Sequence, residues 1–519
     1  MSILKPPPFS PIYLNGFIYG YLIAAFLIAG CETKENSVVT TTNKTTEEET
    51  IQTQVEENIE SLKLEDVSKD RDKKNDSAYS KPIRDILVSN VVELNAAISQ
   101  AKPNDRIVMR NGTWKDLRID FNSKGEPSKP VILIAQSPGK VVLTGKSRIL
   151  LTKPYLVLED LLFEDGTIEK GAVISIDSDH CSVRSTAIIN CNPSSFNMKC
   201  SWIRIKGSWN TVEDCLFKEK TTLGPLIINY GYNARYNTIR GCHFQDIPLV
   251  SKKNGREIIR VIGPGHDDKL NDDGAFCTIE NNLFQNADGE GIEIISLKSS
   301  RNLVRNNTVL ASCGGFVSRR GGYNIFNSNI ILGNFKSGTF GFRLSNQFHE
   351  VRHNYVGSVV HSGIAALCGE FVDSALTNGF RNPSDIIKKP LYSSTKNCLI
   401  TNNTIINATH GVEVGRGYLK DWNRMQLVLL PESNEIKNNH ILNSKDAAIH
   451  VISQEAKKPF SLFEFLPNYI DDNRISDKNS TGSPVQDFNL WKQSNISTGA
   501  DRRLLKLLSP DDVGPLWMR

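Results

Sequence analysis

NLVRNNTV, residues 302–309, is one copy of a phrase that returns through most of the chain. Each copy reads polar, then apolar, then a turn with Asn, then apolar again. Other clear copies are NTVEDCLF (210–217), NTIRGCHF (237–244), CTIENNLF (277–284), NIFNSNII (324–331), CLITNNTI (398–405) and NEIKNNHI (434–441). Short β-branched strands separated by turns, with no 3.6-residue period, predict an all-β right-handed parallel β-helix.

The second Asn of the phrase sets the length of one coil. It falls at Asn282, Asn307, Asn329 and Asn354, and subtraction gives spacings of 25, 22 and 25 residues. An Asn at one position of every coil can bind its neighbours and satisfy the turn backbone, so we expect this ladder to be structural. The spacing of 49 from Asn354 to Asn403 leaves room for an extra coil or for long loops.

Composition limits the classes of partner and of metal site. The 519 residues carry a net charge of only +4, which does not favour a nucleic-acid partner. Nine of the ten cysteines follow Cys31, and none forms a CxxC pair, so no zinc site is expected. Cys215 and Cys242 hold the same place in successive phrases, and we expect reduced core thiols there rather than a disulfide.

The N-terminal residues 1–30 predict a lipoprotein signal peptide. Lys5 supplies a positive charge, and Tyr19–Ala29 is an apolar stretch too short for a convincing membrane span. Ile28-Ala29-Gly30-Cys31 resembles the bacterial lipobox, which implies lipidation of Cys31; an ordinary signal peptide with a chance cysteine is the alternative. The polar residues 31–81 then form a disordered tether, and the protein is expected to be lipid-anchored in the bacterial cell envelope.

Both ends of a solenoid need cover. Leu94, Ala97, Ile98 and Ala101 recur at helical spacing and predict a short N-terminal capping helix. The segment from Asp501, with its leucines at 504, 505, 507 and 508, is expected to close the other end. Residues 82–519 are therefore predicted to form one β-helix domain.

Three charged segments interrupt the repeat in consecutive coils: KKNGREIIRVIG (252–263), GEGIEIISLKSS (289–300) and GGFVSRRGGYN (314–324). Together they resemble polysaccharide lyase family 6, which includes alginate lyases and the dermatan-cleaving chondroitinase B. The resemblance runs from residue 88 to the C-terminus. It implies a lyase that removes the C5 proton of a uronate in a polymer and expels the 4-linked oxygen.

The resemblance assigns the catalytic roles. Lys298 matches the family's catalytic base, and Arg319 matches its catalytic arginine. The C5 proton is very weakly acidic, so the reaction needs a positioned base and a cation that neutralises the neighbouring carboxylate. The family usually gives the arginine the role of general acid. Since a guanidinium almost never loses its proton, Arg319 can instead stabilise the leaving oxygen or the carboxylate while water supplies the proton.

Calcium is implied by the same resemblance. Asn254 and Glu293 match two ligands of the metal-dependent members, whereas the third ligand falls at Gly291, with Glu290 one place away. Residues three apart on a strand point to opposite faces, so Glu290 and Glu293 can share a metal only if a bulge intervenes. Calcium also requires further oxygen ligands from water or substrate.

Several arginines bear on the substrate. Arg343, in GFRLSNQFHEV, matches an arginine of the alginate-cleaving branch, so alginate is favoured and a chondroitin or dermatan sulfate is the alternative. Arg320 stands where many relatives have histidine, and we expect it and Arg260 to contact substrate. Without calcium, Arg256, Arg260 or Arg343 could neutralise the substrate carboxylate. The expected partner is therefore an anionic polysaccharide, and the protein is expected to be a monomer.

Two other classes remain open from the sequence. A β-helix glycoside hydrolase would use two carboxylates, for which Asp288, Glu290 and Glu293 are available. That mechanism gives Lys298 and Arg319 no obvious task. A noncatalytic polysaccharide-binding solenoid would explain the repeat and the tether, but not the three charged segments.

Overall fold

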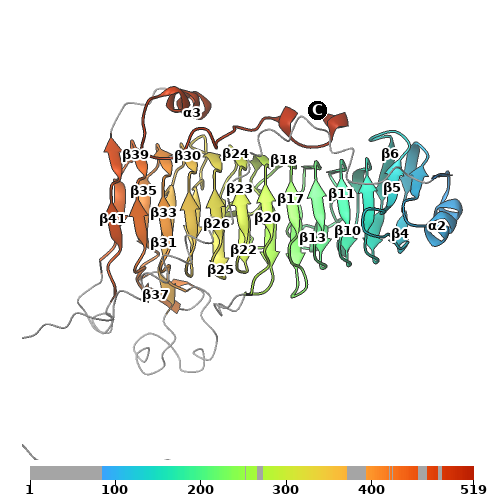
Figure 1. Cartoon of the computed structure of the whole chain (residues 1–519), viewed down its shortest axis with the longest axis horizontal. Helices are drawn as coiled ribbons and strands as arrows, with labels where there is room; N and C mark the ends of the chain where they lie inside the picture. The colour runs from blue at the N-terminus through green and yellow to red at the C-terminus, as the bar shows by residue number, and fades with distance from the viewer. Residues whose placement is uncertain are drawn as a thin grey trace, which may run out of the picture. The chain divides into compact units, whose positions relative to one another are not determined.

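Each copy of the repeated phrase supplies two strands, because its apolar residues on either side of the Asn turn enter different sheets. In NLVRNNTV, Leu303–Arg305 and Thr308–Leu310 lie in two different sheets, and a third strand completes the coil. All pairs within the three long sheets are parallel, and the coils stack along one axis (Figure 1). The fold is a right-handed parallel β-helix, as the repeat predicts.

We name the three long sheets A, B and C in the order in which the chain meets them. Sheet A has 14 strands: β1 (Asp85–Val88), β2 (Arg106–Met109), β5 (Val131–Ala135), β8 (Leu156–Glu159), β11 (Ser182–Arg184), β14 (Thr211–Glu213), β17 (Thr238–Arg240), β20 (Thr278–Glu280), β23 (Leu303–Arg305), β26 (Ile325–Asn327), β29 (Glu350–Arg352), β33 (Leu399–Thr401), β38 (Glu435–Lys437) and β41 (Tyr469–Asp471). Sheet B has 13 strands: β3 (Gly112–Lys115), β6 (Val141–Gly145), β9 (Leu162–Gly166), β12 (Ala187–Ile189), β15 (Leu216–Lys218), β18 (His243–Ile247), β21 (Leu283–Ala287), β24 (Thr308–Leu310), β27 (Ile330–Leu332), β30 (Tyr355–Gly357), β34 (Thr404–Ile406), β39 (His440–Leu442) and β42 (Arg474–Ser476).

Sheet C has 12 strands: β4 (Arg118–Phe121), β7 (Arg148–Leu151), β10 (Gly171–Ile176), β13 (Cys200–Ile205), β16 (Ile227–Tyr230), β19 (Ile259–Ile262), β22 (Glu293–Lys298), β25 (Gly315–Arg320), β28 (Phe342–Leu344), β31 (Ile364–Leu367), β35 (His410–Arg416) and β40 (Ala447–Val451). A small antiparallel sheet joins β32 (Gly369–Glu370), β37 (Met425–Leu429) and β36 (Asp421–Trp422).

This computed structural model describes residues 84–251, 253–265, 273–370, 393–419, 421–422, 425–453, 465–476 and 482–519. The expected signal peptide, Cys31 and the tether to residue 81 lie outside the described residues. Among the described residues, no helix is long and apolar enough to cross a bilayer.

The asparagine ladder forms as predicted. Asn282 Nδ2 donates to Asn307 Oδ1 at 2.9 Å, and Asn307 repeats this contact with Asn329 at 3.0 Å. The contact continues from Asn354 to Asn403 at 3.0 Å, and β30 pairs directly with β34. The 49-residue spacing is therefore one coil with long loops, not an extra coil.

The interior of the coils is apolar and stacked. Phe217, Phe244 and Phe284 lie above one another, with ring centroids 5.2 and 4.8 Å apart. All nine cysteines after Cys31 are buried and free, so the expectation of reduced core thiols at Cys215 and Cys242 is confirmed. The buried side chains of successive coils therefore stack into one continuous apolar core.

The N-terminal end is covered by the predicted helix. Helix α2 (Val91–Gln100) begins at Asn90, whose side chain accepts the N–H of Glu93, and it buries Leu94, Ala97 and Ile98. It lies at the end of the coils beside the first strands (Figure 1). The capping helix is therefore present where the sequence predicts it.

The C-terminal segment differs in position from the expectation. After α3 (Pro484–Gln493), the chain runs back along the coils through the 3-10 turns η3 (Pro510–Asp512) and η4 (Leu516–Met518) (Figure 1). Ala500 N–H donates to Thr404, Leu508 N–H to Thr308, and Trp517 Nε1 to the carbonyl of Ser185. We call residues 500–519 the strap, since they cross the outer side of sheet B rather than closing the end.

Candidate active site

Four consecutive strands of sheet C, β19, β22, β25 and β28, carry the predicted catalytic and substrate-binding side chains. Strand alternation decides which of them face outward, because β19 buries Ile259 and Val261 and leaves Arg260 and Ile262 on the outer face. Ile262 pairs with Lys298 in the next strand. The predicted base therefore lies on the outer face of sheet C.

Lys298 is hydrogen-bonded to a buried carboxylate, that of Glu257. Its Nζ donates to Glu257 Oε1 at 3.1 Å, and Arg260 Nε donates to the same oxygen at 2.7 Å. Glu257 is fully buried, which by itself would raise the pKa of its carboxyl. The charges of Lys298 and Arg260 outweigh burial and hold that pKa below its ordinary value. Glu257 is thus an anion that orients both cations.

The carboxylates of Glu257, Glu290 and Glu293 form one buried cluster, with an oxygen of each within 4.8 Å of the others. Glu290 lies in the turn before β22, between Gly289 and Gly291, which both have positive φ, so strand alternation does not separate it from Glu293 and no bulge between the two residues is needed. Burial, with the charges of Glu257 and Glu293, raises the pKa of Glu290 to about 7. No described residue donates a hydrogen bond to the buried Oε2 of Glu293.

Arg319 approaches the cluster from the next strand. A register shift between β22 and β25 pairs Leu297 with Ser318 and Lys298 with Arg320, which leaves Arg319 as the bulged residue beside the proposed base. Its Nη1 lies 3.7 Å from Glu293 Oε1, and its side chain is 15% exposed. The bulge brings the two predicted catalytic residues onto neighbouring strands, with Arg320 directly opposite Lys298.

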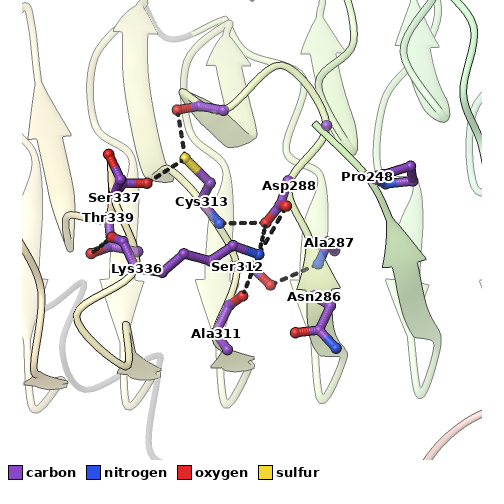
Figure 2. A network of polar contacts seen from close by, with 12 residues as sticks. Pro248, Asn286, Ala287, Asp288, Ala311, Ser312, Cys313, Lys336, Ser337 and Thr339 are labelled. Carbon is purple, nitrogen blue, oxygen red and sulfur yellow. Dashed lines mark hydrogen bonds and ion pairs between the residues drawn. The ribbon is translucent and has the colours of Figure 1, made fainter. Parts of the chain in front are cut away.

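The corner that presents Glu290 is held from outside the site (Figure 2). Asp288 accepts Lys336 Nζ at 2.7 and 2.8 Å and the backbone N–H of Cys313 at 2.8 Å. Lys336 also donates to the carbonyl of Ala311 at 3.0 Å. Asp288 is therefore occupied by Lys336 and is not part of the glutamate cluster, which removes it from the pair that a hydrolase would need.

Arg256 also stabilises this corner, and its guanidinium is not accessible to a substrate. It is 3% exposed, and its guanidinium donates to the carbonyls of Gly289 at 2.6 Å and Lys220 at 2.9 Å. The backbone N–H groups of Gly255 and Arg256 donate to Glu290 at 2.6 and 3.0 Å. The expectation that Arg256 could neutralise a substrate carboxylate is therefore wrong, because its donors are buried against backbone carbonyls.

The remaining predicted residues lie at the edges of this arrangement. Asn254 is exposed on the loop before β19, directly before the backbone groups that bind Glu290. Arg343 lies on β28, opposite Val317 of β25, with its guanidinium carbon 4.1 Å from the centroid of the Phe340 ring. Glu257 was not predicted, although the segment NGREIIRVIG places a carboxylate at the start of a strand otherwise built for burial.

The cluster fits a calcium ion in its donor chemistry. It offers three carboxylates, one of which has an oxygen without a hydrogen-bond donor, and calcium prefers such oxygen ligands. Lys298, Arg260 and Arg319 already compensate part of this negative charge. Glu290 and Glu293 are the residues best placed to hold the ion, with Glu257 at the side that faces Lys298.

Comparison with known proteins gives the family. A family model described as Chondroitinase B matches residues 88–507. The PL6 family polysaccharide lyase Pedsa3628 from Pseudopedobacter saltans is 39% identical, with a TM-score of 0.75, over 83% of this chain and 99% of that chain. The PL6 family alginate lyase AlyGC is 25% identical, with a TM-score of 0.68, over 83% of this chain and 58% of that chain.

A third solved structure shares the fold. A mannuronic acid specific family 6 lyase from the human gut microbiota is 24% identical, with a TM-score of 0.65, over 84% of this chain and 97% of that chain. A search of curated proteins finds no match. The family model covers most of the chain, and the chain therefore belongs to the chondroitinase B family and is a PL6 polysaccharide lyase.

Proposed function

We propose that this lyase cleaves alginate by β-elimination, with Lys298 as the base and Arg319 as the residue that stabilises developing negative charge. The observation that carries the proposal is the juxtaposition of Lys298 and Arg319 on neighbouring strands, beside a buried carboxylate cluster. Both side chains are only partly exposed, which strengthens their electrostatic interaction with a bound anion.

The reaction divides between these residues as follows. Neutral Lys298 Nζ takes the C5 proton of the uronate, and the C5 electron pair forms the C4–C5 double bond as the C4–O4 bond breaks. Water protonates the leaving O4, while Arg319 stabilises the carboxylate or the leaving oxygen as charge develops. Glu257 orients Lys298 through the 3.1 Å hydrogen bond.

The carboxylate cluster beside Lys298 is the proposed calcium site. The ion, when bound, would neutralise the substrate carboxylate and so make the C5 proton more acidic. Glu290 and Glu293 would hold it, and Asn254 lies on the loop that the Glu290 carboxylate fixes. Of the three arginines expected to replace calcium, Arg260 and Arg343 lie at partly exposed positions of this face, where either could bind the substrate carboxylate.

Alginate is favoured over a sulfated galactosaminoglycan for two reasons. AlyGC, a relative at 25% identity, is an alginate lyase. Arg343 also matches an arginine of the alginate-cleaving branch. It lies at the partly exposed position of β28, and its guanidinium packs on the Phe340 ring. The alternative substrate is dermatan sulfate, which the name of the matching family model suggests.

The test is ultraviolet absorbance of the full-length chain with alginate and, separately, with dermatan sulfate, each with calcium and with a chelator. We expect the band of unsaturated uronate to grow on alginate. Growth on dermatan sulfate alone would transfer the activity to the alternative substrate. A flat trace on both polymers would overturn the proposal and favour a noncatalytic polysaccharide-binding solenoid.

Replacement of the base separates catalysis from binding. Lys298→Ala should lower kcat on alginate by about a thousandfold, because positioned proton transfer contributes factors of that order. Lys437→Ala is the matched control, since the Lys437 side chain is 46% exposed and its one ion pair among the described residues is with Glu435 in sheet A. An unchanged kcat in Lys298→Ala would remove Lys298 from the mechanism.

We also propose that Cys31 is lipidated and that residues 31–81 tether the lyase domain to the bacterial cell envelope as a monomer. The lipobox-like sequence before Cys31 supports this placement. Membrane fractionation after metabolic labelling with a fatty-acid analogue tests it. Wild-type chain should carry the label and pellet with membranes, and Cys31→Ala should do neither.

A further inference from the structure

The outer face of sheet C continues toward the N-terminus beyond Lys298, and its side chains change in character there. Ile262 lies beside Lys298 in β19, and Tyr230 lies beside Ile262 in β16. Because neighbouring strands are about 4.8 Å apart, Tyr230 lies about 10 Å from Lys298 along the helix axis. Tyr230 is 51% exposed, so the row that holds the proposed base leads to an open aromatic ring.

Tyr230 belongs to a group of exposed aromatic side chains that we call the aromatic patch: Trp209, Tyr230, Tyr232 and Tyr236. Tyr232 is 75% exposed, and Trp209 stacks on Tyr236 with ring centroids 4.2 Å apart. All four come from two successive coils. Elsewhere among the described residues, exposed aromatic side chains occur only singly, at Phe335, Phe348 and Tyr469. A gathering of exposed apolar rings on a folded protein indicates a binding surface.

A positive charge accompanies the aromatic patch. Arg204 follows Ile203, which pairs with Ile227, so Arg204 lies opposite Ile228 in the row that also holds Arg260. Its Nη2 donates to Ser175 Oγ at 2.9 Å, its Nε has no hydrogen-bond partner, and no carboxylate pairs with it among the described residues. Neighbouring Lys206, by contrast, is paired with Asp177 at 2.6 Å. Arg204 is therefore a cation still available to an anionic ligand.

We propose that the aromatic patch and Arg204 form a distal subsite for the same polymer whose linkage Lys298 breaks. This inference rests on the proposed function. Pyranose rings present apolar C–H faces that pack on aromatic rings, and a guanidinium binds a uronate carboxylate through paired hydrogen bonds. One sugar unit is about as long as the strand spacing, so a chain along the helix axis places roughly one sugar per coil. The second sugar from the cleaved linkage would then meet Tyr230, and the third would meet Arg204.

Kinetics on substrates of two lengths test this subsite in the full-length protein. We compare the double variant Tyr230→Ala/Tyr232→Ala and Arg204→Gln with wild type on polymeric alginate and on an alginate trisaccharide. On the polymer, KM should rise about fivefold or more, while kcat changes little, because a distal contact contributes binding and not chemistry. A trisaccharide that spans the cleaved linkage has at most two sugars on this side and does not reach Arg204, so Arg204→Gln should leave KM on the trisaccharide unchanged.

The matched control is Tyr469→Ala, since Tyr469 is 62% exposed but lies on β41 of sheet A. It should leave KM unchanged on both substrates. Equal losses on the polymer and the trisaccharide in Arg204→Gln, or no loss on the polymer in either variant, would overturn the subsite.

A binding measurement keeps the inference testable if the wild-type chain releases no unsaturated product, which would be a failure of the proposed function alone. In that case, calorimetry with polymeric alginate compares wild type with the same variants. Weaker binding by the patch variants supports the subsite, and equal binding overturns it. Loss of binding to anionic phospholipid vesicles without loss of alginate binding would also overturn it, since the patch would then be a membrane contact.

Discussion

At the scale of single residues, the site depends on one carboxylate that binds two cations. Glu257 has no exposed surface, and it accepts hydrogen bonds from both Lys298 and Arg260. A buried charge is tolerated when such partners surround it, and removing one partner leaves the others uncompensated. Glu257 thus stabilises the fold and orients Lys298, the proposed base.

Replacement of this carboxylate should therefore affect both properties. Glu257→Gln should lower the free energy of unfolding by about 3 kcal/mol, because Lys298 and Arg260 would lose their common anion. It should also lower kcat on alginate, and Glu257→Asp should recover part of that loss. Chemical denaturation and steady-state kinetics measure the two effects. Full activity in Glu257→Gln would show that the hydrogen bond to Lys298 does not position the base.

Sequence reasoning reached Lys298 and Arg319 but not Glu257, and the reason is physical. A lysine and an arginine in matched phrases of consecutive coils attract attention because they interrupt an apolar pattern. Glu257 precedes a strand by two residues, where a carboxylate commonly faces solvent. Only the folded structure, in which Lys298 Nζ and Arg260 Nε both donate to Glu257 Oε1, shows that it meets Lys298.

A buried histidine gives the protein a predictable response to acid. His349 is fully buried, its Nδ1 accepts the N–H of Asn324, and its Nε2 lies 2.9 Å from the carbonyl of Ser345. Burial lowers the pKa of His349 to about 4, whereas an unfolded histidine has a pKa of about 6.5. The unfolded state therefore binds the proton more readily between these pH values.

The stabilisation from neutral His349 is thus present above about pH 6.5 and is lost as pH falls toward about 4, which amounts to about 3 kcal/mol. Denaturant titrations at several pH values measure this slope. Carboxylates titrate in the same range, so the comparison is with His349→Asn, whose stability should fall less steeply. Parallel slopes in the two proteins would contradict the assignment.

At the scale of elements, one ion pair contributes to holding the corner between sheets B and C. Asp288 follows β21, and Lys336 reaches it from the segment after β27 (Figure 2). The Asp288 side chain is 11% exposed, whereas that of Lys336 is 36% exposed. The pair spans three coils, and it holds the turn that leads to Glu290.

Loss of the lysine should loosen this turn. Lys336→Ala should lower the free energy of unfolding by about 1–2 kcal/mol, a value reduced from that of a buried pair because Lys336 is partly exposed. Lys437→Ala is the control, since its exposed pair with Glu435 should contribute less than about 0.5 kcal/mol. Chemical denaturation of both variants measures the difference. Equal effects would mean that the corner does not depend on Asp288.

The secondary-structure elements were largely predictable, because the spacing of the repeated phrase gives the length of one coil. The asparagine ladder, the strand pairs around it and helix α2 follow from patterns that recur or that have helical spacing. The position of the strap does not follow. Its leucines indicate burial, but nothing in a single apolar segment specifies whether it covers an open end or the side of a sheet.

At the scale of the whole molecule, the strap changes how the coils depend on one another. In a solenoid each coil contacts only its neighbours, so stability is a sum of local terms and distant coils are weakly coupled. The strap binds Thr404 at one point and the carbonyl of Ser185 at another, and it packs Val513 against Leu283 between them. It therefore connects coils that the β-helix alone would leave independent.

Removal of the strap's distal part should separate those coils. Deletion of residues 509–519 withdraws buried Val513 and the hydrogen bonds at Gly241 and Ser185, so we expect a loss of about 2–4 kcal/mol. Amide exchange should rise most in the coils between residues 139 and 241, and unfolding should become less cooperative. Leu516→Ala, at a position 63% exposed, should change neither property. If the deletion protein unfolds in one transition with unchanged exchange in those coils, the β-helix is cooperative without the strap, and the strap only covers sheet B.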